Sequence, residues 1–265
     1  MLRLYVLAFL VFLYAPILLL PLFAFNDGTV IAFPLDGFTT RWFSELWVNS
    51  ELHRALFNSL WVAAIAAVLS VLLGLAAARA NVRYRFPGKA AAMGLIMLPL
   101  VLPEIIVATS LLVVAVRLLG WDLSLWTVVA AHVLICTPFA IAILNASFQA
   151  LDPALEEAAV DLGCTRPETF RLITLPLVMP GIVAALLISF TISLDEFIIA
   201  FFLTGSDPTL PVYIWSLLRF PRLIPVVMAL GTILVILSIL ILTLAEWNRR
   251  RGLARAGVKD TGGFL

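Results

Sequence analysis

Three carboxylic acids lie inside long apolar runs of the sequence, where acids are rare. Glu104 directly follows Pro103 in one run, and Asp195 and Glu196 lie midway through a later one. An acid at the centre of a membrane helix costs about 2.5–3.5 kcal/mol on insertion scales, so such a residue is by default a functional candidate. Carboxylates in this setting bind cations or relay protons. We therefore predict that Glu104, Asp195 and Glu196 line a path through a membrane.

The composition indicates that the apolar runs around these acids lie in a membrane. The chain has 265 residues, of which 63% are apolar and 12% are charged. A soluble domain of this size is about 45–50% apolar and about 25% charged, so a water-soluble enzyme is excluded. The net charge of +1 indicates no nucleic-acid partner. The sequence predicts an all-α integral membrane protein whose surroundings are lipid.

Six stretches are long and apolar enough to cross a membrane, which takes roughly 20 mostly apolar residues. The first has no small-residue cleavage site after it, so we expect a retained span rather than a secretory signal. The whole chain, residues 1–265, is predicted to be one transmembrane domain. The expected spans are about 4–25, 56–78, 90–119, 124–146, 177–203 and 225–247, with a loop at 147–176.

The positions of Lys and Arg outside the spans predict the orientation. Twelve of them fall at the chain ends and in the loops after the second and fourth spans, and five fall on the other side. Both termini are therefore expected in the cytoplasm, which agrees with an even number of spans. The larger group is Arg3, Arg79, Arg83, Arg85, Lys89, Arg166, Arg171, Arg249, Arg250, Arg251, Arg255 and Lys259, and the smaller is Arg41, Arg54, Arg117, Arg219 and Arg222.

The loop after the fourth span carries the signals of two capped helices. Asp152 followed by Pro153 is typical of an N-cap and a first helical position, and Gly163 is placed to end that helix. Thr165 and Glu168 have the spacing of a capping box for a second helix. Two ordered helices in one cytoplasmic loop indicate a docking surface.

The same loop contains a long motif. Glu157-Ala158-Ala159, Gly163 and Ile173-Thr174-Leu175-Pro176 read E-A-A-x3-G-x9-I-x-L-P. This pattern resembles the cytoplasmic signature of permease subunits of bacterial ABC importers. The resemblance implies the six-helix fold of type I importer permeases and a coupling helix that docks on an ATP-hydrolysing subunit. It assigns that docking to Glu156, Glu157, Ala158, Ala159, Asp161 and Gly163.

Other segments are similar to the spermidine/putrescine permeases within that family. They are residues 38–43, 103–105, 193–196, 203–205 and 209–211. The resemblance implies a homologous second permease subunit, two copies of an ATP-binding subunit that uses ATP and Mg, and a periplasmic substrate-binding protein. It places the chain in the bacterial inner membrane as a non-catalytic subunit without a cofactor of its own.

A polyamine path would need carboxylates for the ammonium groups and an aromatic face for the methylene spacers and cation–π contacts. Glu104, Asp195 and Glu196 are our candidates for the first, and Trp42 is our candidate for the second. Because adjacent helical residues point about 100° apart, Asp195 and Glu196 belong to different faces. Ser189 and Ser193 share the face of Glu196. We expect one of the two faces to line the path and the other to meet the second permease.

Several alternatives remain open on the sequence alone. The importer could carry another organic ion, an amino-acid-like compound or iron, and a proton-coupled secondary transporter or an ion channel would need no ATP. The sequence has no G-x-x-x-x-G-K-[ST] phosphate loop, so a partner would have to bind ATP. His132 and Cys136 share a helix face but lack further metal ligands, and we interpret them as packing residues.

Overall fold

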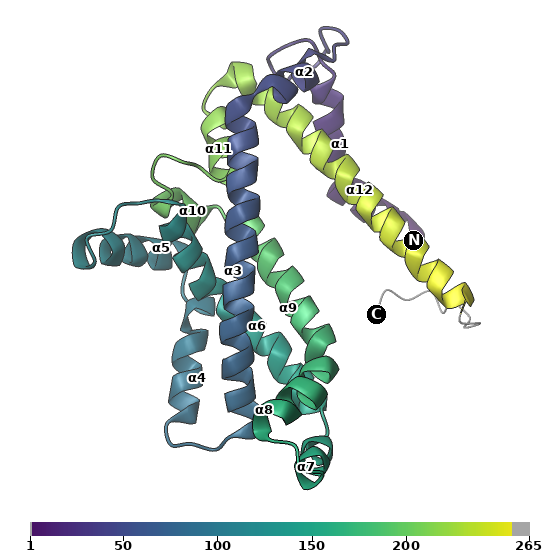
Figure 1. The fold of residues 1–265 in the computed structure, drawn as a ribbon. Coiled ribbons are helices and arrows are strands. Elements are labelled where there is room, and N and C mark those ends of the chain that lie inside the picture. Colours follow the sequence, from purple (N-terminus) through teal and green to yellow (C-terminus); the bar gives the residue numbers. More distant parts are fainter. Residues whose placement is uncertain (1, 256–265) are drawn as a thin grey trace. The chain divides into compact units, whose positions relative to one another are not determined.

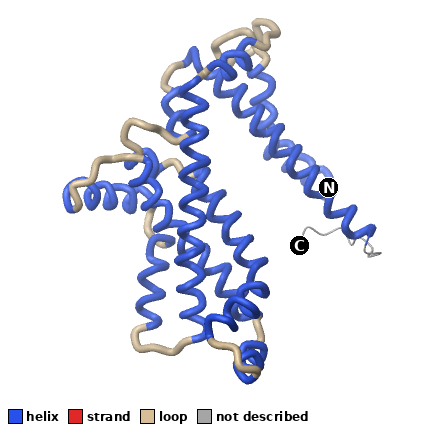
Figure 2. The backbone as a smooth tube through the Cα atoms, in the orientation of Figure 1, coloured by secondary structure: helices blue, strands red, loops and turns tan. Residues whose placement is uncertain are grey.

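The computed structural model describes the backbone of residues 2–255 and the side chains of residues 2–240 and Thr243. In this part, helices are joined by loops (Figures 1 and 2), with one isolated bridge between Asn26 and Phe38. The predicted all-α class is confirmed. The α-helices are α1 Leu2–Ala24, α2 Arg41–Val48, α3 Ser50–Arg83, α4 Lys89–Met97, α5 Glu104–Val113, α6 Leu125–Ala150, α7 Pro153–Asp161, α8 Arg166–Thr169, α9 Leu175–Asp195, α10 Ile198–Leu203, α11 Leu210–Leu218 and α12 Ile224–Arg255. Short 3-10 segments are η1 Leu98–Leu100 and η4 Pro221–Leu223, and π-helical turns are η2 Val114–Leu118 and η3 Phe170–Thr174.

Five continuous helical stretches of the described chain are long and apolar enough to cross a membrane, and there are six if a bent pair of helices counts as one span. They follow the order of the six predicted spans. The fifth begins earlier than expected, because α8 continues through η3 into α9 without a loop. The stretches are Leu2–Ala24, Ser50–Arg83, Leu125–Ala150, Arg166–Asp195 and Pro221–Leu240, and the bent pair is Lys89–Leu100 with Glu104–Leu118.

The third predicted span, residues 90–119, is not one straight helix. The helix direction bends by 103° between its two halves, Lys89–Leu100 and Glu104–Leu118, at a break that contains Pro103. Proline has no N–H to donate, and the residue before it is disfavoured in the helical conformation, so the ladder stops there. Pro103 itself is extended, with ψ of 131°, and Glu104 begins the next helix.

The fifth predicted span, residues 177–203, is also broken. Helix α9 ends at Asp195, Glu196 is extended with ψ of 121°, and α10 begins at Ile198. The expectation that Asp195 and Glu196 lie within one continuous helix is therefore corrected. Both helix breaks place an acid at a helix end.

The chain forms two compact units. The first unit contains the residues before Glu51 and those after Tyr213. In it, α1 packs along α12, with Leu20 against Gly231, and α2 also packs on α12. Arg249, Arg250, Arg251 and Arg255, which contributed to the orientation prediction, lie outside the described side chains, and Lys259 lies outside the described residues.

The second unit, Glu51–Tyr213, has its core along α3, α6, α9 and α10. Helix α6 packs on α9 over much of its length, and α5 packs on α10. Small residues bring α3 close to α6: a Cβ added to Gly74 would lie 2.8 Å from Cβ of Ala140. Ser70, one turn earlier in α3, donates to the Val133 carbonyl at 3.4 Å. Close backbone approach is the usual means of helix association in lipid.

We predict that Gly74→Ala destabilises the protein by about 1–3 kcal/mol, because the added methyl group overpacks a tight contact with α6. Gly94→Ala is the matched control, because a Cβ there meets nothing within 4 Å. This control should be neutral or stabilising by up to about 1 kcal/mol, as expected for alanine in a helix. Thermal unfolding of both variants in detergent measures the difference, and equal shifts would contradict the proposed packing role of Gly74.

Candidate functional site

A cavity of about 830 Å³ lies in the second unit at the two helix breaks. Its walls come from the bend before α5, from α6, and from the junction of α9 with α10. We call it the α5–α9 cavity. It is lined by Pro99, Leu100, Leu102, Pro103, Glu104, Ile135, Phe139, Thr191, Ile192, Asp195, Glu196, Phe197 and Ile198.

The three acids singled out in the sequence line this one cavity, although more than 90 residues separate Glu104 from the other two. Glu104 is the first residue of α5, and Asp195 is the last residue of α9. Both side chains are exposed, and neither has an ion-pair partner among the described residues. Two carboxylates are thus available to a ligand in the cavity.

The C-terminal end of α9 adds to the negative charge of Asp195. The C-terminal end of a helix carries a partial negative charge from carbonyl groups without intrahelical partners. Helix α9 ends at Asp195, so the carboxylate and the helix end are negative at the same place. Broken membrane helices bind cations at such ends. The arrangement favours a cationic ligand.

Glu196 lines the cavity but uses its carboxylate within the fold. Its Oε1 accepts from the backbone N–H of Ile199 at 3.0 Å, and its Oε2 accepts from that of Ala200 at 3.0 Å. The residue is only 8% exposed. Glu196 therefore caps α10 at the break, a role that the assumption of a continuous helix could not predict.

His132 of α6 contacts the same break. Its ring is fully buried, with Nδ1 2.7 Å from Oγ of Ser193 and Nε2 3.4 Å from Oε2 of Glu196. The face with Ser189, Ser193 and Glu196, one of the two faces expected either to line the path or to meet a second permease, is buried within this chain. The interpretation of His132 as a packing residue missed these polar contacts. The signal was available: a histidine in an apolar run, and a predicted stripe of two serines and an acid elsewhere.

Trp42 lies in the first unit. It is 4% exposed, and its indole Nε1–H donates to the Asn26 carbonyl at 2.8 Å. The guanidinium of Arg41 lies 4.1 Å from the centre of its ring. The aromatic face that the sequence assigned to a substrate is occupied by Arg41 in this structure.

The loop with the E-A-A motif forms the expected helix α7. Asp152 accepts from the backbone N–H of Ala154 at 2.9 Å, and Gly163 has φ of +93°, so both predicted helix ends are confirmed. The next helix begins with the predicted capping box, in which Glu168 accepts from the N–H of Thr165 at 2.8 Å. Of the residues assigned to docking, Glu157, Ala158, Asp161 and Gly163 are exposed, Glu156 is half-buried, and Ala159 is buried.

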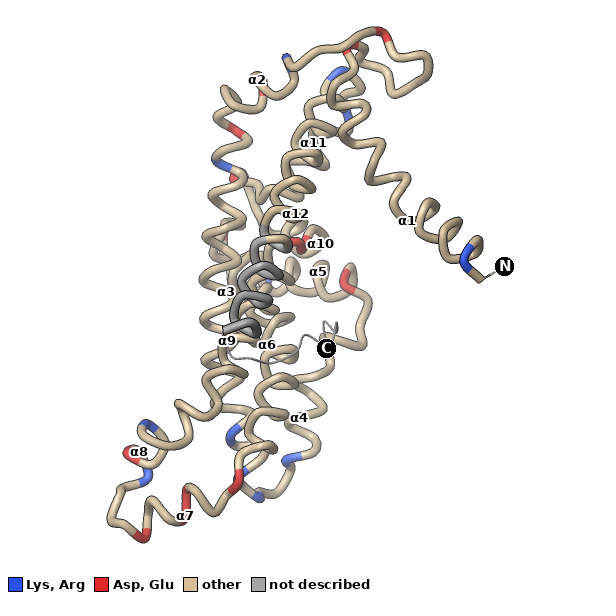
Figure 3. Tube along the Cα trace, turned by 90° about the vertical axis from the view of Figure 1, so that its right-hand side faces the viewer, with Lys and Arg blue, Asp and Glu red and all other residues tan. Residues whose placement is uncertain are grey.

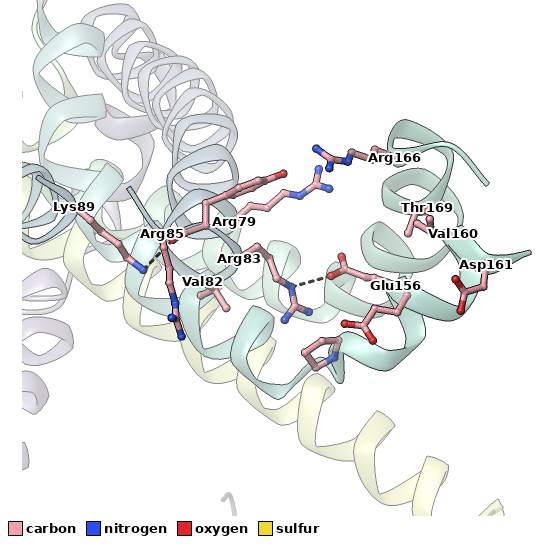
Figure 4. A pocket seen from close by; sticks show the side chains of 13 residues that line it. Arg79, Val82, Arg83, Arg85, Lys89, Glu156, Val160, Asp161, Arg166 and Thr169 are labelled. Carbon is pink, nitrogen blue, oxygen red and sulfur yellow. Dashed lines mark hydrogen bonds and ion pairs between the residues drawn. The ribbon is translucent and has the colours of Figure 1, made fainter. Parts of the chain in front are cut away.

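A second cavity, of about 750 Å³, lies between α7 and the end of α3 (Figure 4). We call it the α3–α7 cavity. Charged residues gather in this region, around α7, α8 and the connection from α3 to α4 (Figure 3). The cavity is lined by Arg79, Val82, Arg83, Tyr84, Arg85, Lys89, Pro153, Glu156, Glu157, Val160, Asp161, Arg166 and Thr169.

Glu156 ties three segments together inside the α3–α7 cavity. Its Oε2 lies 2.8 Å from Nε of Arg83 at the end of α3 (Figure 4). Its Oε1 accepts from the hydroxyl of Thr174 at 2.5 Å. Arg83 also donates to the Leu151 carbonyl at 3.1 Å. The two charged side chains are only 17% and 18% exposed. We call Arg83, Glu156 and Thr174 the α7 clasp.

Comparison with known proteins gives a consistent result. Residues 70–251 match the family described as binding-protein-dependent transport system inner membrane component. The chain is 39% identical to the putrescine transport system permease protein PotI of Escherichia coli strain K12, over 78% of this chain and 76% of the relative. It is 36% identical to the spermidine/putrescine transport system permease protein PotC of Shigella flexneri, over 95% and 93%.

Solved structures share the fold. A bacterial ABC transporter involved in the import of the acidic polysaccharide alginate aligns with a TM-score of 0.72 at 15% identity, over 94% of each chain. An amino acid ABC transporter with histidines aligns with a TM-score of 0.54 at 22% identity, over 78% of this chain and 99% of the other. The predicted importer-permease fold is confirmed.

We predict that Glu156→Gln destabilises the protein by about 1–3 kcal/mol, because it leaves the half-buried Arg83 without its charged partner. Glu157→Gln, the same change at the adjacent exposed acid, should have little effect. Thermal unfolding of Glu156→Gln, Arg83→Gln and the double variant in a double-mutant cycle measures the coupling. Equal losses of stability in Glu156→Gln and Glu157→Gln would contradict the proposed role of the α7 clasp. Additive effects of Glu156→Gln and Arg83→Gln in the cycle would also contradict it.

Proposed function

The chain belongs to the family of binding-protein-dependent transport system inner membrane components, and from this premise we propose that it is the permease subunit of an ATP-driven importer for polyamines such as putrescine and spermidine. As a member of this family it is a multi-pass membrane protein. We propose that its two compact units act together as one permease domain in a bacterial inner membrane, with both termini in the cytoplasm.

The α5–α9 cavity is the main observation that supports a polyamine as the substrate. It presents two unpaired carboxylates, Glu104 and Asp195, beside the negative end of α9. Ammonium groups of a polyamine lose water on entering the membrane, and carboxylates replace that water. The relatives PotI and PotC are named for the transport of the same compounds.

Energy for transport would come from outside the chain. We propose that two ATP-binding subunits, using ATP and Mg, dock on the exposed residues of α7, and that the α7 clasp transmits their movement to α3 and α9. A homologous second permease subunit would complete the path. A periplasmic binding protein would deliver the substrate to outer segments near residues 26–54 and 204–224. The chain itself would perform no catalysis and bind no cofactor.

Uptake of radiolabelled putrescine and spermidine into proteoliposomes tests the substrate. The vesicles contain the chain with its co-purified partners, the binding protein and ATP. Uptake should require ATP hydrolysis, and Glu104→Gln should reduce it about tenfold at low substrate, because a charged hydrogen bond worth about 1.5–3 kcal/mol is lost. Asp122→Asn, which removes the charge of an exposed loop acid outside the cavity, is the matched control and should transport normally.

The outcomes separate the parts of this proposal. ATPase activity that the binding protein stimulates without polyamine movement would retain the importer and reject the substrate. Transport driven by a proton gradient without ATP would reject the importer mechanism. Unchanged uptake by Glu104→Gln would remove Glu104 from the path.

Docking has a separate test. Glu157→Lys should leave membrane insertion intact but weaken association with the ATP-binding subunit, because it reverses a charge on the exposed face of α7. Co-purification of that subunit with the tagged permease measures the effect. Glu45→Lys, the same change at an exposed acid of α2, is the control. Normal recovery of the ATPase with Glu157→Lys would contradict the assignment of α7 as the docking helix.

A further inference from the structure

The second unit contains a polar cluster that no packing requirement explains. It joins α6 to the break between α9 and α10 and consists of His132, Ser189, Ser193 and Glu196. His132 and Ser189 are fully buried, and Ser193 is 3% exposed. We call it the His132 cluster. It lies directly behind the α5–α9 cavity, because Glu196 belongs to both.

Burial of the polar groups of the His132 cluster costs folding free energy. Burying a polar group without a hydrogen bond is unfavourable, and an apolar side chain would fill the same space without that cost. Within the described residues, Nε2 of His132 and Oγ of Ser189 are buried and lack hydrogen-bond partners. The Nε2 atom nevertheless lies 3.4 Å from Oε2 of Glu196, at ion-pair distance. The histidine therefore faces a carboxylate that is already engaged.

That carboxylate determines the shape of the break. A new helix in lipid begins with backbone N–H groups that need acceptors from the protein. Glu196 meets those of Ile199 and Ala200, both at 3.0 Å. Asp195 immediately precedes Glu196, so its backbone direction at the end of α9 depends on where Glu196 is held. Moving the cap would move the carboxylate that faces the cavity.

The cap also affects the charge of the cavity. Without the Glu196 carboxylate, the N–H groups of Ile199 and Ala200 would lose this acceptor, and their partial positive charge near the cavity would disfavour a cation. With it, their partial positive charge is neutralised, and Glu104 and Asp195 remain for the ligand. Glu196 thus acts on a cationic substrate through the fold, and its own oxygens are occupied.

We infer that His132 is a positioning residue for the transported cation: it holds Glu196 on the start of α10 and thereby presents Asp195 to the α5–α9 cavity. The inference rests on the proposed function, and it separates Glu196 from the residues that contact substrate. Ser193 supports the ring from its other nitrogen, at 2.7 Å.

The two ring nitrogens allow a sharp test by substitution. In His132→Gln the amide reaches about as far as Nε2 and retains a donor toward Glu196. In His132→Asn it reaches about as far as Nδ1 and retains only the contact with Ser193. His132→Ala removes both. The assay is ATP-dependent putrescine uptake by the full complex in proteoliposomes, measured over a range of substrate concentrations.

We expect His132→Gln to remain within about threefold of the wild-type half-saturating concentration. His132→Asn and His132→Ala should raise it about tenfold or more, the loss expected when a charged contact worth about 1.5–3 kcal/mol is removed, while ATPase activity without substrate is retained. Val128→Ala, one turn earlier on the same buried face of α6 and part of the apolar core, is the control for packing and should behave as wild type.

Equal performance of the glutamine and asparagine variants, or an unchanged half-saturating concentration in all three, would overturn the inference. If none of the histidine variants assembles, Glu196→Asp decides, because it keeps the charge but withdraws the carboxylate from α10. It should produce the same rise, and wild-type behaviour would overturn the inference. A wild-type complex that moves no putrescine would instead reject the proposed function.

Discussion

Inside a membrane every backbone N–H and C=O group must find its partner within the protein, and the functional part of this fold depends on that constraint. A helix can break in lipid only where something satisfies the freed groups. At the junction of α9 and α10 the Glu196 carboxylate does so, with 3.0 Å contacts to two amides of α10. Because Glu196 stabilises that break, Asp195 lies at the end of α9 and lines the α5–α9 cavity. Glu104, the first residue of α5 after Pro103, lines the same cavity.

The same arrangement of acids occurs twice in the chain. Glu156 and Glu157 are adjacent in α7, and Asp195 and Glu196 are adjacent at the end of α9. In each pair one acid is turned inward and holds helices together, Glu156 with Arg83 and Glu196 with α10. The other acid, Glu157 or Asp195, is exposed. In each pair the inward acid stabilises the position of the helix end or helix that carries the exposed acid, so the two acids of a pair have different environments.

The fold alone does not determine the cargo. A structure with a TM-score of 0.72 to this chain belongs to a transporter involved in the import of the acidic polysaccharide alginate, whose charge is opposite to that of a polyamine. Function resides in sites placed on a shared fold, so under the proposed function the side chains that line the α5–α9 cavity would select the cargo. In this chain the cavity is lined by the carboxylates of Glu104 and Asp195, and α9 ends at Asp195.

The sequence by itself determined the apolar helices, the caps of α7 and α8, the left-handed turn at Gly163 and the family, because each depends on local residue types and spacing. It also identified Glu104 and Asp195 as unusual, since acids in apolar runs stand out without a structure. Only the tertiary structure decided that the two share a cavity, that Glu156 and Glu196 hold helices, and that His132 faces Glu196 rather than apolar neighbours. These roles arise from contacts between residues far apart in the sequence, such as His132 and Ser193, which are 61 positions apart, or from a helix break. Predictions from helical periodicity assume an unbroken helix, and they do not show which helix faces contact each other.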